Sequence, residues 1–429
     1  MSILIKNGFV VTQNQTRDIV QQDVYIEDDR IVEIGKIDHE ADLEADATGK
    51  IVMPGLINTH CHIAMSIMRG IADDVSFDEF LSRMFKYDAN RTREDVFHGS
   101  MLGAVEMILS GTTSFVDLYY YEDEIAKAVQ QAGLRGFLAW AVLDKEFTTQ
   151  EGEPLQNCEN FIKEWQGNPT IEPLVGLQGC YVCSEETFLA SQALAQKYNT
   201  LSHFHLAETR QEIDGHKEKT GKHIIQDLSD IGFLDDKVLA AHTVWADDKE
   251  IDILAKSGMN VSHCPVSNAK LSVGQVAPVP KMLEKGINVS LGTDGCVSNN
   301  SQNLFADMKF TALIHKVANN DPAIMPAQTV LDLATINGAK ALGKGEELGS
   351  IEVGKKADII LLDTRVPHLT PTSRATILPH LVYSSNPVTV DSSIINGELV
   401  YTQGEFMSLD YWEVMENAEV YARKLLGEE

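Results

Sequence analysis

Long apolar runs and basic residues are both scarce in this sequence. Of its 429 residues, 63 are acidic and 35 are basic, and the formal net charge at pH 7 is −28. Nucleic acids and anionic membranes attract lysine and arginine, so this charge argues against partners of either kind. No apolar run reaches the roughly 18 residues of a membrane span, and residues 1–6 lack the basic start and cleavage site of a signal peptide. We therefore expect a cytoplasmic protein.

Cysteine is scarce as well, and its pattern argues against two kinds of scaffold. The cysteines show no disulfide framework of the type found in small secreted domains. Cys180 and Cys183 form one CxxC motif, but no second CxxC is present to complete a structural zinc site. We expect reduced thiols at positions 61, 158, 180, 183, 264 and 296.

What the sequence does contain is a repeated alternation of strand and helix patterns. Hydrophobic residues make up 44% of the chain, enough for a large core and more than one simple domain needs. Eight apolar, β-branched runs are expected to be strands: 51–62, 112–119, 136–143, 171–178, 201–207, 238–243, 260–263 and 288–292. Segments with helical periodicity lie between them, among them 93–109, 122–132, 185–198, 249–256 and 279–284. Eight parallel strands with intervening helices predict an α/β fold, a (β/α)8 TIM-like barrel.

The two ends of the chain have a different pattern, with short alternating β segments and turn signals between them. We expect these segments to form one small β-sandwich built from both termini, comprising residues 1–50 and 350–408. The barrel then occupies residues 51–349. The last segment, 409–429, has helical periodicity and is expected to pack as a terminal helix.

Two histidines stand at the end of the first predicted barrel strand. His60 and His62 close an apolar run. Because successive strand side chains point to opposite faces, the two histidines share a face and are able to grip one metal ion. Alone, such a pair is equally compatible with a structural or surface role, since histidine is an ordinary core residue as well as the commonest metal ligand.

Three further strand ends carry groups of the same kind. His205 is followed by Glu208, His242 ends another strand, and Asp294 follows the last one. In a (β/α)8 barrel the carboxyl ends of the strands form the active-site face. Each histidine taken singly also fits a filled core position, but the ordered set favours an active site.

These residue types suit a hydrolytic metal site. Zinc favours imidazole and carboxylate ligands and leaves one position for water, whose pKa it lowers to about 7. Three imidazoles and one carboxylate are available from His60, His62, His205 and Asp294. Glu208, three residues after a candidate ligand, suits a proton shuttle between water, a ring nitrogen and the leaving group. His242 is expected to polarise the attacked centre or to hold the nucleophile.

The sequence resembles the amidohydrolase superfamily, and within it the branch of methylthioadenosine/S-adenosylhomocysteine deaminases and chlorohydrolase-like aminohydrolases. The resemblance covers essentially the whole chain and includes Pro-Gly-Leu-Ile-Asn-Thr-His at 54–60. The other motifs that carry it lie at residues 3–8, 69–74, 110–113, 261–265, 292–300 and 354–359. Together these motifs are specific for the family.

The resemblance implies a role for each site residue and a metal number. By it the metal ligands are His60, His62, His205 and Asp294, the proton shuttle is Glu208, the non-ligating electrostatic residue is His242, and Ser298 lies near the substrate. Two-metal members of the superfamily use a carboxylated lysine from the fourth barrel strand as a bridge, and this chain has no lysine between Lys163 and Lys197. We therefore expect one divalent metal ion per chain, zinc first, with iron, manganese or nickel as alternatives.

Several positions that contact nucleosides in these relatives differ here. Gln178 stands where the relatives carry Gly-Pro-His, and Asp88 aligns near their ribose-binding glutamate. Trp140 stands where one type carries an arginine, and Phe80 where they carry a tryptophan. We expect these four side chains and Ser298 to contact the substrate. The alternative is that Gln178 bonds the loop backbone and Trp140 fills the barrel mouth.

The sequence thus predicts a metal-dependent aminohydrolase, which replaces an exocyclic amino group on an N-heterocycle with oxygen and releases ammonia. The favoured substrate is an adenosine-type nucleoside: 5'-methylthioadenosine, S-adenosylhomocysteine, 5'-deoxyadenosine or adenosine. Alternatives are deamination of guanine, pterin, cytosine or a triazine, chlorohydrolase-like removal of another leaving group, and a non-enzymatic scaffold on the same fold. The expected partner is a small molecule, and a homo-oligomer is left open.

Overall fold

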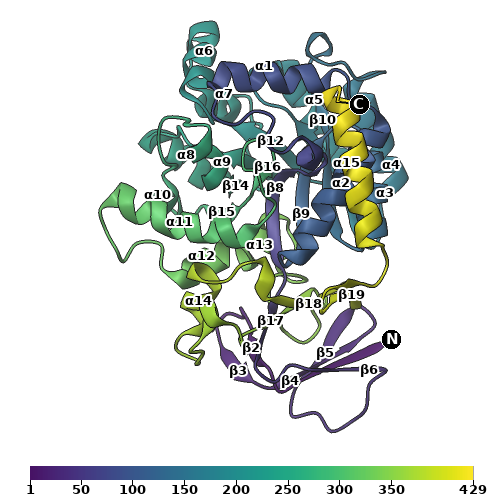
Figure 1. The fold of residues 1–429 in the computed structure, drawn as a ribbon. Coiled ribbons are helices and arrows are strands. Elements are labelled where there is room, and N and C mark those ends of the chain that lie inside the picture. Colours follow the sequence, from purple (N-terminus) through teal and green to yellow (C-terminus); the bar gives the residue numbers. More distant parts are fainter. Residues whose placement is uncertain (429) are drawn as a thin grey trace.

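Eight parallel strands follow one another in chain order around the central sheet of the molecule. They are β8 (Leu56–His62), β9 (Thr112–Tyr119), β10 (Arg135–Val142), β11 (Ile171–Leu177), β12 (Ser202–Leu206), β13 (Val238–His242), β14 (Asn260–His263) and β15 (Asn288–Leu291). The computed structural model, which describes residues 1–428, closes this sheet through the short strand β16 (Asp294–Gly295), which follows β15 in the chain and pairs with β8. The predicted (β/α)8 barrel is confirmed (Figure 1).

The barrel strands are apolar because both of their faces are covered. Every residue of β9 and β10 is buried, as expected for parallel strands between a packed barrel interior and an outer layer of helices. Side chains complete the closure between the first and last strands. The Thr59 hydroxyl donates to the carbonyl of Leu291 at 2.9 Å, and Oδ1 of Asn58 accepts from the amide of Thr293 at 3.0 Å. These contacts hold the end of β8, which carries His60, beside the segment that carries Asp294.

Helices form the outer layer around the barrel (Figure 1). Four have the predicted bounds, α2 (Arg93–Leu109), α3 (Glu122–Ala132), α5 (Glu185–Tyr198) and α10 (Val279–Glu284), and α8 (Asp248–Ser257) is one residue longer at each end. A capping box of Thr92 and Asp95 begins α2. The remaining helices before the terminal one are α1 (Phe77–Asp88), α4 (Pro154–Trp165), α6 (Arg210–Thr220), α7 (Ile224–Asp230), α9 (Pro265–Lys270), α11 (Leu304–Asn319), α12 (Ala327–Leu333), α13 (Ile336–Ala341) and α14 (Ile377–Tyr383).

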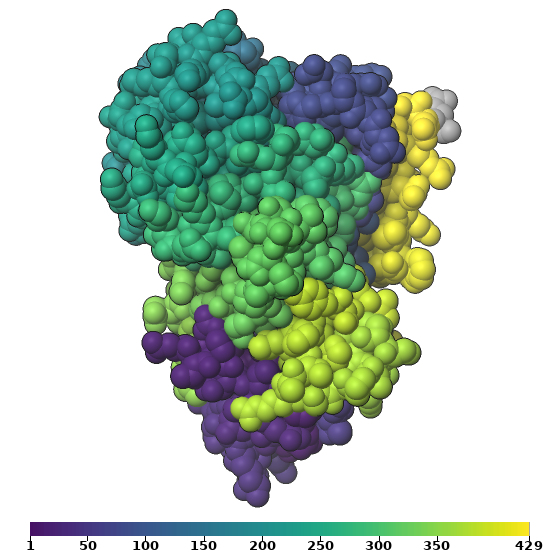
Figure 2. All heavy atoms as spheres, turned by 90° about the vertical axis from the view of Figure 1, so that its left-hand side faces the viewer, coloured from purple at the N-terminus to yellow at the C-terminus, as the bar shows by residue number. Residues whose placement is uncertain are grey.

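Both ends of the chain contribute to a β-sandwich below the barrel in Figure 1, as predicted. One sheet has the order β5-β4-β1-β6 and the other the order β20-β19-β18-β17-β7-β2-β3. Their strands are β1 (Ser2–Lys6), β2 (Phe9–Val11), β3 (Ile19–Gln21), β4 (Asp23–Glu27), β5 (Arg30–Gly35), β6 (Leu43–Asp46), β7 (Lys50–Pro54), β17 (Ile359–Asp363), β18 (Val390–Ile395), β19 (Glu398–Thr402) and β20 (Glu405–Phe406). Apolar side chains from both sheets, such as Val24 and Ile359, share one core. Figure 2 shows the N-terminal residues, in purple, packed beside residues near the C-terminal end, in yellow-green.

The predicted strand over residues 51–62 is two strands in the structure. β7 pairs with β2 and β17 of the sandwich, and β8 begins the barrel. Gly55 lies between them, and a Cβ atom there would come within 2.1 Å of Oγ1 of Thr113. The first residues of the predicted barrel segment therefore belong to the sheet of the termini. Both halves of the run are apolar, so composition alone does not reveal the break.

The chain returns from the sandwich to the barrel through helix α15 (Tyr411–Leu426), which lies beside α2 (Figure 1). The side chain of Asp410 caps its first turn, and Val414 and Ala418 are buried against the barrel layer. The helix lies within the segment 409–429 in which it was predicted, although Glu429 itself is outside the described residues. Within residues 1–428, no helix is long and apolar enough to cross a membrane.

Candidate active site

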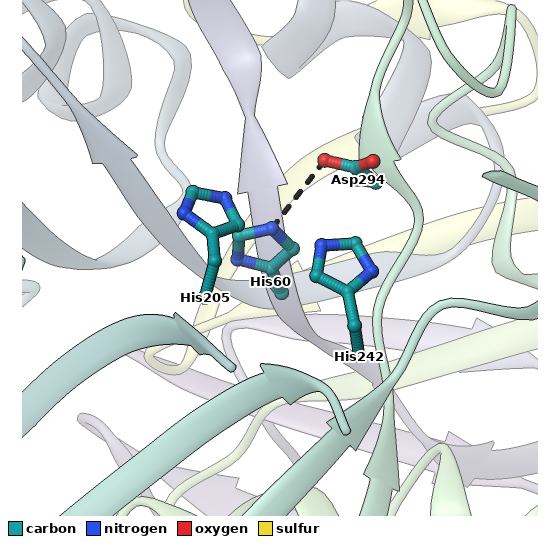
Figure 3. A group of neighbouring side chains, drawn as sticks. All are labelled: His60, His205, His242 and Asp294. Atoms are coloured by element: carbon teal, nitrogen blue, oxygen red, sulfur yellow. Dashed lines mark ion pairs between the residues drawn. The ribbon is translucent and has the colours of Figure 1, made fainter. Parts of the chain in front are cut away.

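Side chains from different barrel strands meet at the carboxyl end of the barrel. The group comprises His60 from β8, His205 from β12, His242 from β13 and Asp294 from β16, and Figure 3 shows the rings and the carboxylate turned toward one another. One ligand atom from each residue lies within 4.8 Å of those of the others. His62 joins them, since its Nε2 is 3.2 Å from Oδ1 of Asp294 and 3.3 Å from Nε2 of His205. The structure therefore brings together all five residues, which we call the strand-end cluster.

The strand-end cluster is buried and held partly by strained backbone. His60 is fully buried, and the other members are at most 8% exposed. His242 and Asp294 have φ angles of 69° and 65°, in the left-handed region that residues other than glycine rarely adopt. Such conformations cost about 1–3 kcal/mol each and persist where the surrounding structure imposes them. The strand ends are therefore shaped to present these side chains to one another.

Backbone carbonyl groups set the orientation of two imidazoles. His62 donates through Nδ1 to the carbonyl of Leu118 at 2.6 Å, and His205 donates through Nδ1 to the carbonyl of Gln178 at 2.6 Å. In its neutral form each ring then carries its proton on Nδ1 and turns a free Nε2 toward the cluster. Metal-binding histidines in proteins are oriented by this kind of contact.

Asp294 is held as a carboxylate despite its burial. Burial alone would raise its pKa, but the nearby imidazoles of His60 and His62 hold the pKa of Asp294 well below its ordinary value. Its Oδ1 lies 3.4 Å and 3.2 Å from Nε2 of these two histidines. Its Oδ2 accepts from the hydroxyls of Ser267 at 2.5 Å and Ser298 at 2.8 Å. Hydroxyl groups therefore orient one oxygen while the other faces the imidazoles.

The donor set of the cluster fits a divalent metal ion. Nε2 of His60 is buried without a hydrogen-bond partner among the described residues, whereas buried polar atoms are nearly always paired. The atoms around it are imidazole nitrogens and a carboxylate oxygen, which are ligand types that zinc accepts. The cluster can therefore hold a metal ion.

Glu208 lies beside the cluster, on the loop after β12. Its Oε1 is 4.0 Å from Nδ1 of His242, a nitrogen that also lies 2.9 Å from Oδ1 of Asn268. Burial raises the pKa of Glu208 above its ordinary value, so that a proton is exchanged closer to neutral pH, as an acid/base group requires. The Glu208 amide donates to Oε2 of Glu212 at 2.8 Å, and burial raises the pKa of Glu212 to about 7.

Two of the predicted substrate residues directly support members of the cluster. Ser298 donates to Asp294, as described above. Gln178 accepts through its backbone carbonyl from His205, and its side-chain amide donates to the hydroxyl of Tyr181 at 3.1 Å. Ser298 through its hydroxyl and Gln178 through its backbone carbonyl therefore orient candidate metal ligands.

A third predicted substrate residue, Asp88, lies at the end of α1 beside the barrel mouth. It accepts from the hydroxyl of Tyr119 at 3.0 Å, and the ring of Tyr119 is 6.1 Å from that of His62, centre to centre. Asp88 also forms an ion pair with the buried Arg91. The Arg91 guanidinium lies over the rings of Tyr119 and Tyr120, at 4.1 Å and 4.8 Å from their centres. Asp88 is therefore a fixed carboxylate, and Tyr119 lies between it and His62 of the cluster.

Trp140 and Phe80, the two aromatic residues predicted to contact the substrate, both pack against other aromatic side chains. Trp140 lies against Phe161 of α4 with ring centres 5.9 Å apart, and its Nε1 donates to Gln150 at 2.8 Å. Phe80 stacks on Phe77 of α1 with ring centres 6.1 Å apart. These contacts of Trp140 are with α4 and the loop before it, so they give no support to its predicted contact with substrate.

Three further residues, none of them predicted from the sequence, support the cluster from behind. His203 lies 2.8 Å from Nδ1 of His60, while Ser267 and Asn268 contact Asp294 and His242. A signal for His203 exists, because the run Ser-His-Phe-His on β12 repeats the His-x-His spacing of the first strand and places both histidines on one face. Ser267 and Asn268 lie on α9, where no strand pattern points to them.

Comparisons with known proteins agree with this geometry. The model described as "Amidohydrolase family" matches residues 51–400. The 5'-deoxyadenosine deaminase of Methanosarcina mazei is 44% identical over 431 residues, covering 99% of this chain and 98% of that protein. The 5-methylthioadenosine/S-adenosylhomocysteine deaminase of Thermoanaerobacter pseudethanolicus is 39% identical over 432 residues, covering 99% of this chain and 100% of that protein.

Solved structures include a similar protein with a metal ion. An adenosine deaminase from Xanthomonas campestris with bound zinc superposes with a TM-score of 0.95 at 28% sequence identity, covering 99% of this chain and 98% of that one. The predicted resemblance and the hydrolase class are thereby confirmed, and the buried histidine and aspartate group supports the predicted metal ion. The chain belongs to the amidohydrolase family.

Proposed function

We propose that this amidohydrolase is a hydrolytic deaminase of adenosine-type nucleosides. The observation that carries the proposal is the buried strand-end cluster with Glu208 beside it. The names of the relatives, for 5'-deoxyadenosine and for methylthioadenosine and S-adenosylhomocysteine, favour an adenine nucleoside altered at its 5' position. The reaction replaces the exocyclic amino group of the adenine ring with oxygen and releases ammonia.

In this proposal one divalent ion, zinc first, is held by His60, His62, His205 and Asp294. The Nε2 atoms of the first three face Oδ1 of Asp294 or one another at 3.2–3.4 Å. His242 is assigned the separate electrostatic role that the family resemblance implies, with its Nδ1 held by Asn268 and near Glu208. When bound, the ion lowers the pKa of a water molecule to about 7 and so supplies a nucleophile at neutral pH. β11 contains no lysine that would form a bridge to a second ion.

Glu208 moves the protons of the reaction. It takes a proton from the attacking water and gives it to the ring nitrogen next to the attacked carbon. It then takes the second proton from the new hydroxyl on that carbon, which becomes the carbonyl group of the product, and gives it to the departing amino group. Protonation matters because a basic amine leaves more easily as neutral ammonia. His242 and Asp294 stabilise the tetrahedral state electrostatically from fixed, buried positions.

We assign Asp88 to the ribose of the substrate. Its carboxylate lies at the barrel mouth, held by Tyr119 and Arg91, and a carboxylate can accept hydrogen bonds from both ribose hydroxyls. Ser298 and Gln178 shape the site through the ligands that they contact. We further propose a cytoplasmic enzyme without nucleic-acid or membrane partners, which the net charge of −28 supports, and we leave its oligomeric state open.

A substrate screen tests the proposal. Zinc-loaded protein is offered 5'-deoxyadenosine, methylthioadenosine, S-adenosylhomocysteine and adenosine, with adenine, guanine, a pterin, cytosine and a triazine as comparison substrates, and ammonia release is measured. We expect the adenine nucleosides to be deaminated fastest. Faster ammonia release from an oxo-bearing ring such as guanine would show that the substrate is another aminated ring, while the deamination chemistry would stand. Ammonia from none of these compounds would contradict the proposed function.

A further inference from the structure

The proposed metal ligands differ in how their rings are anchored. His62 and His205 each donate through Nδ1 directly to a backbone carbonyl at 2.6 Å. His60 instead contacts a side chain, with its Nδ1 2.8 Å from Nε2 of His203. Nδ1 of His203 in turn lies 2.9 Å from the carbonyl of Leu239 on β13. His60 is therefore the ligand that reaches a backbone carbonyl through a second imidazole.

The far end of this chain of contacts sets the direction of its hydrogen bonds. A carbonyl oxygen only accepts, so Nδ1 of His203 carries the proton that contacts Leu239. A neutral imidazole has a single N–H, which leaves Nε2 of His203 as an acceptor. His60 then donates from Nδ1, and its own Nε2 is unprotonated at 3.4 Å from Oδ1 of Asp294. This Nε2 is the buried atom that lacks a hydrogen-bond partner among the described residues.

We propose that His203 is a positioning residue that fixes the tautomer and ring orientation of His60 for metal binding. The inference rests on the role of His60 proposed above. Strand geometry supports it, because His203 and His205 lie two residues apart on β12 and therefore share the inward face. One strand thus supplies a ligand and also the support of a ligand on another strand.

Two substitutions test the contacts of the two His203 ring nitrogens one at a time. In His203→Asn the side-chain amide occupies the place of Nδ1, so the contact with Leu239 is kept and the contact with His60 is lost. In His203→Gln the amide reaches the place of Nε2 and can accept from His60, while the contact with Leu239 is lost. The purified proteins are stripped of metal and titrated with zinc against a chromophoric chelator. We expect His203→Asn to raise the zinc dissociation constant roughly 10- to 100-fold, the usual cost of losing such a supporting contact, and His203→Gln to recover most of that loss.

A matched control separates this effect from the general cost of replacing a buried histidine. His315 is fully buried and contacts His263 at 3.2 Å rather than a proposed ligand, so His315→Asn is expected to leave zinc affinity unchanged. Equal zinc affinity of the unsubstituted protein, His203→Asn and His203→Gln would overturn the role of His203 while the metal site stands. If the unsubstituted protein binds no zinc, the proposed metal site itself fails and the inference falls with it.

A neutron structure of the unsubstituted, zinc-loaded enzyme tests the proposal even if a variant fails to fold. The expected result is a deuteron on Nδ1 of both His203 and His60. A deuteron on Nε2 of His203 would make His203 the donor and would overturn the proposal.

Discussion

The pKa values of two carboxyl groups of the site, those of Glu208 and Asp294, are shifted in opposite directions. Burial raises the pKa of Glu208. In Asp294 the effect of burial is outweighed by the nearby imidazoles of His60 and His62, which hold its pKa well below the ordinary value. Glu208 is therefore protonated more readily than an ordinary glutamate while Asp294 stays ionised, a division of roles that is common in acid/base catalysis.

The role of Glu208 is tested by Glu208→Gln, which keeps the shape of the side chain and removes its titrating proton. We expect turnover of the best nucleoside substrate to fall by roughly 10²- to 10⁴-fold, the usual worth of a positioned acid/base group, with the metal still bound. Metal content and steady-state rate are measured on the same sample. Glu218→Gln on the exposed face of α6 is the matched control and is expected to have normal turnover. Loss of metal from Glu208→Gln would make Glu208 a ligand instead.

Glu212 gives the fold a pH dependence of its own. Burial raises its pKa from 4.5 to about 7, so the folded state holds this proton more tightly than the unfolded chain does. The stability gained is present below about pH 4.5 and is lost as the pH rises through about 7. Glu212→Gln mimics the neutral form, so we expect its urea midpoint, relative to the unsubstituted protein, to rise between about pH 5 and about pH 8. A constant difference across this range would show that Glu212 does not titrate as described.

Among the elements, helix α1 and strand β9 together carry the candidate ribose contact. Asp88 ends α1, and Tyr119 ends β9. We expect Asp88→Ala to raise KM for the nucleoside by a factor equivalent to about 1.5–3 kcal/mol, the worth of hydrogen bonds to a charged group, and to leave KM for a free base unchanged. The assay is steady-state deamination of both compounds.

Because Asp88 is also the ion-pair partner of Arg91, a second variant, Asp88→Asn, is needed. Asp88→Ala leaves the buried Arg91 without its ion pair, and an unpaired buried charge is destabilising. Asp88→Asn keeps a polar partner for Arg91 and is expected to raise KM for the nucleoside to a smaller extent. An equal rise in KM for nucleoside and free base would remove Asp88 from the ribose site.

The junction between sandwich strand β7 and barrel strand β8 depends on a close approach at Gly55. A Cβ atom there would come within 2.1 Å of the Thr113 side chain, so Gly55→Ala is expected to destabilise the protein by about 1–3 kcal/mol, as overpacking of a tight core does. Gly215→Ala is the matched control, because that position on α6 is exposed and open and alanine favours a helix by up to about 1 kcal/mol. Chemical denaturation of both variants measures the difference, and equal stability would mean that the junction relaxes freely.

On the scale of the whole molecule, local periodic patterns predict the barrel and its strand-end residues well. Alternation of β and α segments gives the barrel, and strand parity places His60 and His62 on one face. The break at Gly55 is not visible, because the apolar composition continues across it. Trp140 is ambiguous for a related reason: β10 is buried on both faces, so burial does not reveal which face a side chain takes.

Residues that support the site from outside the barrel strands are the least predictable part of the molecule. Ser267 and Asn268 reach the cluster from α9, and Arg91 reaches Asp88 from the end of a loop. Their positions follow from how the helical layer packs on the barrel, which no short-range pattern encodes. His203 is the exception, since its spacing from His205 is a strand signal.

The dependence of deamination on one bound metal ion is tested most directly by measuring metal content and ammonia release together. Protein reconstituted with zinc is assayed for metal per chain and for ammonia from 5'-deoxyadenosine, then stripped with a chelator and assayed again. We expect close to one ion per chain, ammonia release that disappears on stripping, and recovery when zinc is returned. Two ions per chain, or ammonia release that survives complete removal of the metal, would contradict this expectation.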